Sequence, residues 1–189
     1  MLNNFTKKAI KETFVELLYE KPYSQITVKN IVEACGINRN TFYYHFDDIP
    51  SLVKEIIEDQ ALEIINEYPS SNSIEECLEK VLNSGMKYKK AILHIHNSAS
   101  RELYEKSLLN VLEHSITQYI NLLAEGKNIA EEDKQLIIKF YKCECFGIII
   151  DWLDHGMPEG IMDDFHRICE LRKGNVEELI FRCDKNYNN

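Results

Sequence analysis

Apolar residues recur every three or four positions along most of the chain, which is the spacing of an amphipathic α-helix. The first such face carries four of them, Ile10, Phe14, Leu17 and Leu18. This first helix should end near Lys21, because Pro22 cannot continue a helix.

A second helix should begin after Thr27, whose hydroxyl can act as an N-cap. Its apolar positions are Val28, Ile31, Val32 and Ala34. Gly36 follows and suits a left-handed turn. Asn38 can cap a short helix through Thr41 to Phe46, and Asp48 can cap a long fourth helix with Pro50 in its first turn. The fourth helix should end before Pro69.

The rest of the chain continues in the same helical pattern. The polar run "PSSNS" at 69–73 predicts a loop, after which Ser73 and Glu76 form a capping box. Further helices are expected at roughly 73–91, 99–124, 130–155 and 158–173, with a short one at 175–183. No alternating strand pattern and no internal repeat occurs. We therefore expect an all-α fold of about nine helices. An N-terminal three-helix helix-turn-helix head (1–47) should join a larger helical domain (48–189).

Composition places the chain among globular proteins. It has 189 residues, of which 44% are hydrophobic and 28% charged. No apolar run approaches the length of a membrane span, and the N-terminus is too polar for a secretory signal. The expected location is therefore the cytoplasm, where the six cysteines would be reduced thiols.

Charge is divided unevenly along the chain. Residues 1–46 carry six Lys/Arg against four Glu, whereas the remainder accounts for a charge of −11 within the total of −9. A mildly basic head on an acidic body fits a protein whose head alone meets a polyanion. A chance fluctuation in surface charge explains the same numbers.

The segment "CGINRNTFYYHF" at 35–46 is either a packed corner of a core or a contact surface. A helix from Thr27, a turn at Gly36 and a helix after Asn38 make a helix-turn-helix, with Ala34 at a close helix crossing. Ile37, Phe42 and Phe46 can fill the space between the helices. The positions left outside are Arg39, Asn40, Thr41, Tyr43, Tyr44 and His45. Such a helix enters the DNA major groove, so we interpret these side chains as a contact surface.

Two of these side chains suit base edges and the others suit the DNA backbone. Arg39 can pair with guanine O6 and N7, and Asn40 can pair with adenine. The hydroxyls and the histidine further along the helix suit phosphate oxygens.

The same residues resemble the DNA-binding head of the tetracycline-repressor (TetR) family. The resemblance covers 5–57 and is centred on "ITVKNIVEACGINRNTFYYHF" at 26–46. The segment "NRNTFYYHFDDI" is similar to the corresponding segment in the DhaS-like branch of this family. "FGIIIDWLDHGM" at 146–157 resembles the Trp-containing end of the penultimate helix in Firmicute-type members. Residues 66–145 contain little that is diagnostic.

The resemblance implies roles at the matching positions. Arg39 and Asn40 would read bases, and Tyr44 would lie at the groove wall. The phosphate contacts would come from Thr27, Lys29, Thr41, Tyr43 and His45. The chain departs from the family at the start of the fourth helix, where many members have a phosphate-binding lysine and this chain has Ile49 after Asp47 and Asp48. A phosphate contact there would need backbone N–H groups, so we expect modest affinity and a steep salt dependence.

The resemblance also implies that 48–189 is an effector-binding and dimerisation domain. Its homodimer would be formed by the last two long helices, about 130–155 and 158–173. Their apolar positions include Leu136, Phe140, Ile148, Trp152, Phe165 and Ile168, some of which must be intramolecular core. The middle helices would enclose an effector site of unknown occupant. Candidate lining residues are Met86, Tyr88, His94, His96 and Tyr104, each of which can equally be ordinary core or surface. In the DhaS-like branch a partner protein can replace the small molecule.

Enzyme, metal and cofactor chemistry finds little support in the sequence. "HIH" at 94–96 and "CEC" at 143–145 lack the spacing of a structural zinc site, and neighbours two apart on a helix diverge. No nucleophile elbow or phosphate-binding glycine loop is present. We expect a transcriptional regulator, a repressor that binds palindromic operator DNA as a homodimer. The alternative is a helical interaction module, without DNA binding or dependent on a co-activator. The operator, the effector and the regulated genes remain open.

Overall fold

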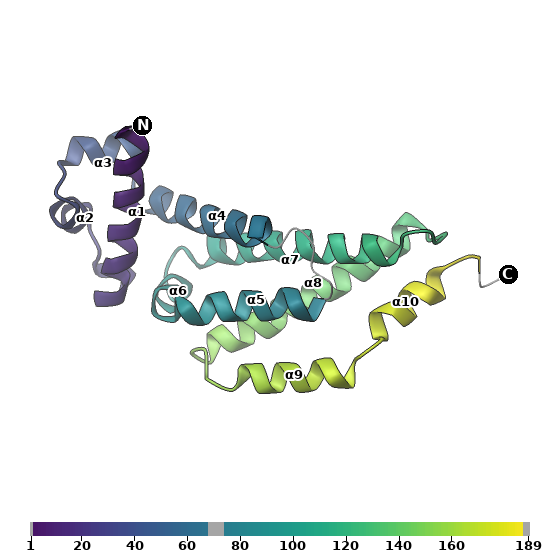
Figure 1. Cartoon of the computed structure of the whole chain (residues 1–189). Coiled ribbons are helices and arrows are strands. Elements are labelled where there is room, and N and C mark those ends of the chain that lie inside the picture. The colour runs from purple at the N-terminus through teal and green to yellow at the C-terminus, as the bar shows by residue number, and fades with distance from the viewer. Residues whose placement is uncertain (1, 68–73, 187–189) are drawn as a thin grey trace. The chain divides into compact units, whose positions relative to one another are not determined.

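The computed structural model describes residues 2–67 and 74–186, and these residues contain ten α-helices, one 3₁₀-helix and no strand (Figure 1). The expected all-α fold is confirmed. The chain forms two compact units. The head unit comprises residues 1–60 and 88–107, and the body unit comprises 61–87 and 108–189. The functional division expected at residues 47 and 48 stays a prediction.

The head unit is built from both the N-terminus and the middle of the chain. It contains α1 (Leu2–Glu20), η1 (Tyr23–Gln25), α2 (Val28–Cys35) and α3 (Arg39–His45), and also the first part of α4 (Ile49–Glu67). The middle of the chain adds α6 (Lys89–His96) and the start of α7 (Arg101–Leu123). The sequence pattern did not predict this second contribution.

The α2–turn–α3 motif follows from local capping chemistry. Thr27 caps α2 by accepting a hydrogen bond from the Asn30 N–H at 3.3 Å, and the Thr27 N–H donates to the Asn30 side-chain oxygen at 3.1 Å. Gly36 ends the helix in the left-handed region, at φ 70° and ψ 29°. The Asn38 side chain then accepts from the Thr41 N–H at 2.9 Å, which begins α3.

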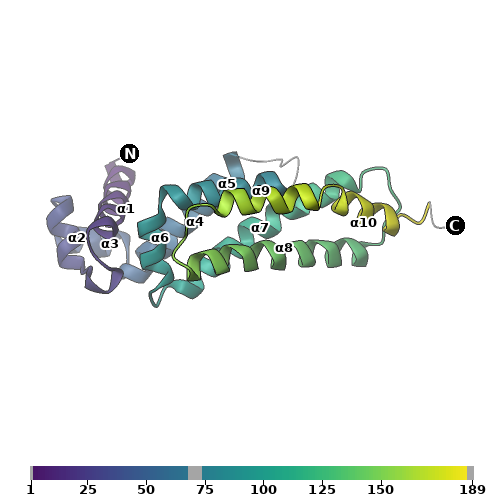
Figure 2. The same ribbon diagram turned by 90° about the horizontal axis from the view of Figure 1, so that it is seen from below.

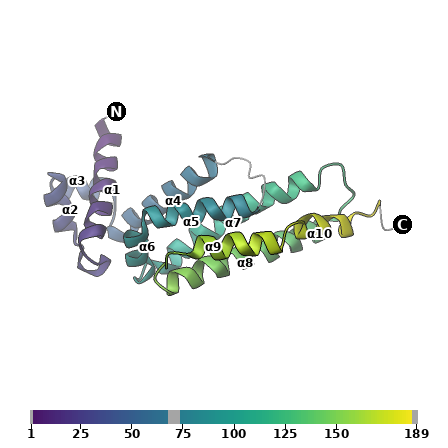
Figure 3. The ribbon, with the colours of Figure 1, turned by 60° about the horizontal axis from the view of Figure 1, so that its bottom comes forward.

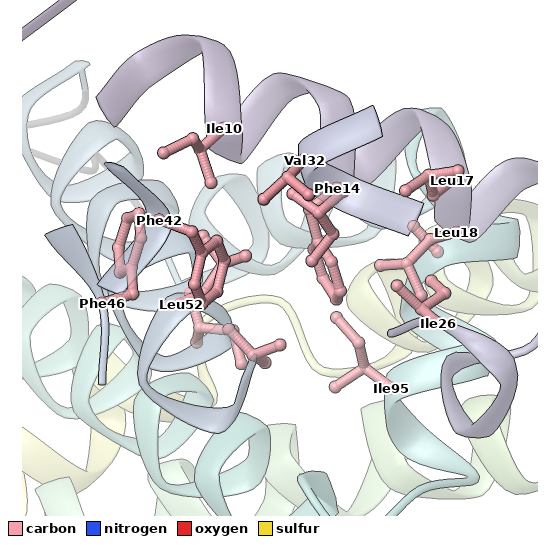
Figure 4. Close-up of a cluster of buried hydrophobic side chains, with 14 residues drawn as sticks. Ile10, Phe14, Leu17, Leu18, Ile26, Val32, Phe42, Phe46, Leu52 and Ile95 are labelled. Atoms are coloured by element: carbon pink, nitrogen blue, oxygen red, sulfur yellow. The ribbon is translucent and has the colours of Figure 1, made fainter. Parts of the chain in front are cut away.

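One hydrophobic core holds the head unit together. Figure 4 shows side chains from α1, α2, α3, α4 and α6 converging on it. Phe14 and Phe42 are fully buried, and Ile95 of α6 belongs to the same cluster. Burial of an aromatic or aliphatic side chain contributes about 1.5–3 kcal/mol. The α6 contribution is therefore part of what stabilises the head.

The body unit contains the rest of the chain. Its helices are the remainder of α4 and α7 together with α5 (Ile74–Lys87), α8 (Glu131–Asp154), α9 (Ile161–Leu171) and α10 (Asn175–Cys183). Helices α8 and α9 lie side by side (Figures 2 and 3). Gly85 allows close packing, because a Cβ there would lie 3.2 Å from the Trp152 ring. The Trp152 Nε1–H donates to the Pro158 carbonyl at 3.1 Å, which fixes the α8–α9 turn.

Several local expectations were wrong. The stretch expected as one helix over 73–91 is broken at Tyr88, because α5 ends at Lys87 and α6 begins at Lys89. This adds a helix to the expected number. Ala34, expected at a close helix crossing, is exposed, and the neighbouring Cys35 packs against the core instead. The capping box expected at Ser73 and the loop at 69–73 lie outside the described residues.

A search of the described helices for a long apolar segment finds no candidate membrane span.

Candidate nucleic-acid interface

Helix α3 separates a buried face from an exposed one. Phe42 is fully buried and Phe46, just after the helix, is 4% exposed. On the other side Tyr43 is 54% exposed and Tyr44 is 73% exposed. Among the other expected contact residues of α3, Arg39 and Asn40 are exposed, and Thr41 and His45 are half-buried.

The aromatic side chains of α3 are ordered by contacts with one another. The Phe42 and Tyr43 rings meet edge to face with centroids 5.5 Å apart. The Tyr44 and His45 rings do the same at 5.1 Å. Edge-to-face packing of this kind is favourable. Each exposed phenol ring therefore has a stabilising contact with a neighbouring ring of the same helix.

The two threonine hydroxyls already have hydrogen-bond partners. Thr27 Oγ1–H donates to the Asn30 side-chain oxygen at 2.8 Å, and Thr41 Oγ1–H donates to the Asn38 oxygen at 3.1 Å. A phosphate contact from either hydroxyl requires it to rotate away from its cap. The capping role is the one that the geometry shows.

The basic side chains of the head differ in how firmly they are held. Lys29 pairs with Glu33 at 3.7 Å on an exposed helix face, and such an i, i+4 pair contributes only about 0.3–0.5 kcal/mol. Arg39 has no ion pair among the described residues. Both can therefore turn toward a ligand at small cost.

Two lysines of α1 form ion pairs with acidic residues of α4. Lys11 Nζ lies 2.6 Å from Glu55 Oε1 and 2.6 Å from Asp59 Oδ2, and Lys7 Nζ lies 2.7 Å from Glu55 Oε2. Burial alone would raise the pKa of Glu55, but the hydrogen bonds from Lys11 and Lys7 outweigh it and lower that pKa below 4.5. Burial likewise opposes the shift at Lys11, yet the two carboxylates raise its pKa above 10.5. These cations stabilise the head and do not add to its basic surface.

The formal charges of the two units differ from the division of charge along the sequence. The head unit contains 11 Lys and Arg and 11 Asp and Glu, so its formal net charge is zero. The body unit carries all of the chain's charge of −9. The basic head expected from residues 1–46 disappears once the acidic part of α4 is included. Attraction to a polyanion has to come from the local placement of a few cations.

The start of α4 offers little to a phosphate. Asp48 caps the helix by accepting from the Ser51 N–H at 2.7 Å, and its own N–H donates to Ser51 Oγ at 3.1 Å. Pro50 has no N–H. Among the first three helical positions this leaves the N–H of Ile49 alone for a ligand. The geometry therefore agrees with the sequence, in which Ile49 stands where many family members have a phosphate-binding lysine.

The residues considered for an effector site are not gathered in one unit. Met86 lies in the body unit, whereas Tyr88, His94, His96 and Tyr104 lie in the head unit. His94 is half-buried and donates to the Leu18 carbonyl. Tyr104 packs against the head core, where burial raises its pKa to about 12. No group of three or more His, Cys, Asp or Glu is placed to hold a metal ion within the described ranges.

A small cavity lies between α5, α8, α9 and α10 of the body unit. Its volume is about 30 Å³, room for about one water molecule and far below the few hundred Å³ of a typical small-molecule site. Arg172 pairs with Glu144 at its wall and lies over the Tyr141 ring, 5.4 Å from the centroid. In this form the cavity is not an effector pocket.

Helix α8 has apolar residues on two opposite faces. Ile137, Ile138 and Trp152 are buried within the chain, whereas Leu136 and Phe140 are 64% and 59% exposed. The exposed stripe continues along the helix through Cys143 and Gly147, both also exposed. On α9, Ile168 and Leu171 are 40% and 63% exposed. We call these six residues the α8–α9 apolar face.

Two family descriptions match this chain. Residues 12–56 match "Bacterial regulatory proteins, tetR family", and residues 72–174, more than half of the chain, match "Transcriptional regulator C-terminal region" of the same family. The chain belongs to the TetR family. Members of this family are transcriptional regulators and not enzymes, so the expected class is confirmed.

Individual relatives are more distant. The "HTH-type dhaKLM operon transcriptional activator DhaS" of Lactococcus lactis is 36% identical over 62 residues, 33% of each chain. The "Uncharacterized HTH-type transcriptional regulator YxbF" of Bacillus subtilis is 23% identical over 182 residues, 90% of this chain but 46% of that protein. The matched regions thus cover less than half of these relatives.

Solved structures support the fold. The "Dihydroxyacetone kinase operon activator DhaS" has a TM-score of 0.73 at 20% identity, covering 95% of this chain and 98% of that one. NalD, a secondary repressor of a multidrug efflux pump in Pseudomonas aeruginosa, has a TM-score of 0.56 at 16% identity, covering 99% of this chain and 100% of that one. At these identities the likeness shows the fold alone.

Proposed function

We propose that this TetR-family regulator binds a palindromic DNA operator as a homodimer in the cytoplasm. The observation that carries the proposal is the exposed surface of α3, with Arg39 and Asn40 in its first turn and the exposed rings of Tyr43 and Tyr44 after them. Arg39 and Asn40 would contact base edges. Thr27, Lys29, Thr41, Tyr43 and His45 would contact phosphates, and Tyr44 would lie at the groove wall.

A single recognition helix reads too few base pairs for a specific site. A two-fold dimer doubles the contacts and sets half-sites about one DNA turn apart. The α8–α9 apolar face supports a second copy of the chain as the partner, because it lies opposite the buried face of α8. Its location also agrees with the two helices that the family resemblance implies.

The expected direction of control is repression, because occupation of a promoter blocks transcription without any further contact. A small-molecule effector or a partner protein would control the dimer, and its identity is open. The name of DhaS describes an activator and that of NalD a repressor, so a promoter–reporter assay with and without the protein has to decide the direction.

The alternative is a helical interaction module that has lost DNA binding. It is favoured by the exposed Asp47 and Asp48, by the net charge of zero on the head unit and by the weak phosphate site at α4. In this case the α3 face would contact protein.

Selection of genomic DNA fragments by the purified protein, followed by fluorescence anisotropy at two salt concentrations, tests the proposal. We expect a palindromic sequence to be enriched and to compete far better than scrambled DNA, with affinity falling steeply as salt rises. Equal and weak binding to all fragments would reject DNA recognition by this chain alone and favour the interaction module.

A further inference from the structure

The last turn of α1 receives hydrogen bonds from α6, which comes from the middle of the chain. The His94 Nδ1–H donates to the Leu18 carbonyl at 2.8 Å, and the Lys90 ammonium donates to the Tyr19 carbonyl. The last four carbonyls of a helix lack partners within it and carry partial negative charge. Lys90 and His94 therefore act as a C-terminal cap supplied by a distant segment.

The placement of α6 makes this contact firm. Lys90 and His94 are four residues apart and lie on one face of α6. The adjacent positions, Ala91 and Ile95, are buried in the head core. Each donor is thus positioned by the next residue of α6, which is buried in the same core as α1.

A third contact joins the same two segments. The Ser100 hydroxyl, just before α7, donates to the Tyr23 hydroxyl at 3.2 Å, and the Tyr23 ring packs edge to face on Phe14 with centroids 6.3 Å apart. The end of α1 and the start of η1 are therefore held from two sides by residues 88–107.

We propose that Lys90 and His94 are positioning residues for DNA binding: by capping α1 from α6 they fix the helix against which α2 packs, and α2 in turn packs against α3. The proposal rests on the proposed DNA-binding function. Helix α6 joins α5 of the body unit through the single residue Tyr88.

The test compares a double variant with a matched control. Lys90→Met with His94→Leu removes both donors and keeps the side-chain bulk. Lys127→Met with His155→Leu removes the same two residue types from the body unit, where they donate to the Leu123 and Asp151 carbonyls. A third variant, Lys90→Arg with His94→Asn, retains a donor at each position.

DNA affinity and hydrogen exchange are measured for all proteins on the fragment that the wild type selects. We expect the first variant to bind about fivefold to tenfold more weakly, the size of effect that one or two net hydrogen bonds produce. The amides in the last turn of α1 should exchange faster, and DNA should no longer protect residues 89–96. The control and the donor-retaining variant should behave like the wild type.

The outcomes distinguish a failure of the proposed DNA-binding function from a failure of the positioning role of Lys90 and His94. If the wild type selects no DNA, the proposed function fails and this inference fails with it. If the wild type selects DNA but the first variant matches the control in affinity and in DNA-induced protection, only the inference fails. A lower melting temperature with unchanged affinity would show that the cap stabilises the fold without positioning α3, and would also overturn it.

Discussion

The basic side chains of the head unit differ in how readily they can contact DNA. Lys11 makes ion pairs of 2.6 Å with two carboxylates and is only 16% exposed, so withdrawing it would break a partly buried network. Lys29 has one exposed partner at 3.7 Å, a pair that costs only a few tenths of a kcal/mol to break. Arg39 has no ion pair to break among the described residues. Recognition should therefore depend on Arg39 more than on the number of basic residues.

Replacing Arg39 with Ala should weaken binding to the selected operator by about 1–3 kcal/mol and relax specificity at one base position. The reason is the loss of a two-pronged contact to a guanine. Anisotropy titrations against operators with single base changes measure both effects. Arg167→Ala, which removes an exposed arginine from the body unit, is the control. Unchanged affinity of Arg39→Ala would exclude a base-reading role.

Gly36 has a conformational role that a substitution can isolate. Its φ of +70° is unfavourable for residues with a Cβ, while a Cβ there would meet no atom within 4 Å. Gly36→Ala should therefore destabilise the protein by about 1–2 kcal/mol through the backbone alone. Gly36→Asn should lose less, because Asn tolerates this region. Urea unfolding followed by circular dichroism checks this order, and equal stability of all three proteins would contradict it.

At the scale of elements, the sequence predicted those features that depend on neighbouring residues. The caps at Thr27, Asn38 and Asp48 and the turn at Gly36 are confirmed, because each is decided within four residues. The break at Tyr88 was missed, because no Gly, Pro or capping side chain marks it. Nothing local reveals that residues 88–107 pack into the head either.

The ion pairs between α1 and α4 make a pH-dependent contribution to stability. The pKa of Glu55 is lowered in the folded state, so its contribution is present above the unfolded value of about 4.5 and is lost as pH falls through the lower folded value. Glu55→Gln should reduce stability at neutral pH and remove part of the loss seen on acidification below pH 4.5.

Chemical unfolding at pH 7 and at several values between pH 5 and pH 3 measures this effect. Glu58→Gln is the control, because Glu58 makes only an exposed pair with Lys54 at 3.8 Å. If Glu55→Gln and Glu58→Gln had the same pH profile, the network at Lys11 would contribute nothing to acid sensitivity.

At the scale of the molecule, α8 shows why sequence periodicity could not separate core from interface. Trp152 and Phe165, both expected as apolar positions of the dimer helices, are buried within the chain. Leu136, Phe140 and Ile168, which belonged to the same expectation, are exposed. Both sets have helical spacing, and only the packing of α8 against its own chain divides them. What covers the exposed set stays a prediction.

Phe140→Glu should convert a dimer into a monomer, because a charge would be buried against apolar atoms of the second copy. Light scattering after size exclusion should give twice the chain mass of 22.1 kDa for the wild type and the single mass for the variant. Far-ultraviolet circular dichroism should be unchanged, since Phe140 is 59% exposed in the isolated chain. Operator affinity should fall with the loss of the second head.

The control for this substitution is Leu122→Glu, which places the same charge on α7 at a residue that is 49% exposed and lies outside the α8–α9 apolar face. It should remain dimeric, so an effect confined to Phe140→Glu assigns the interface to that face. A dimeric Phe140→Glu protein would place the interface elsewhere, and a monomeric wild type would reject the homodimer. In that last case one α3 helix would have to recognise DNA alone, and specific affinity would require a partner protein to supply the missing contacts.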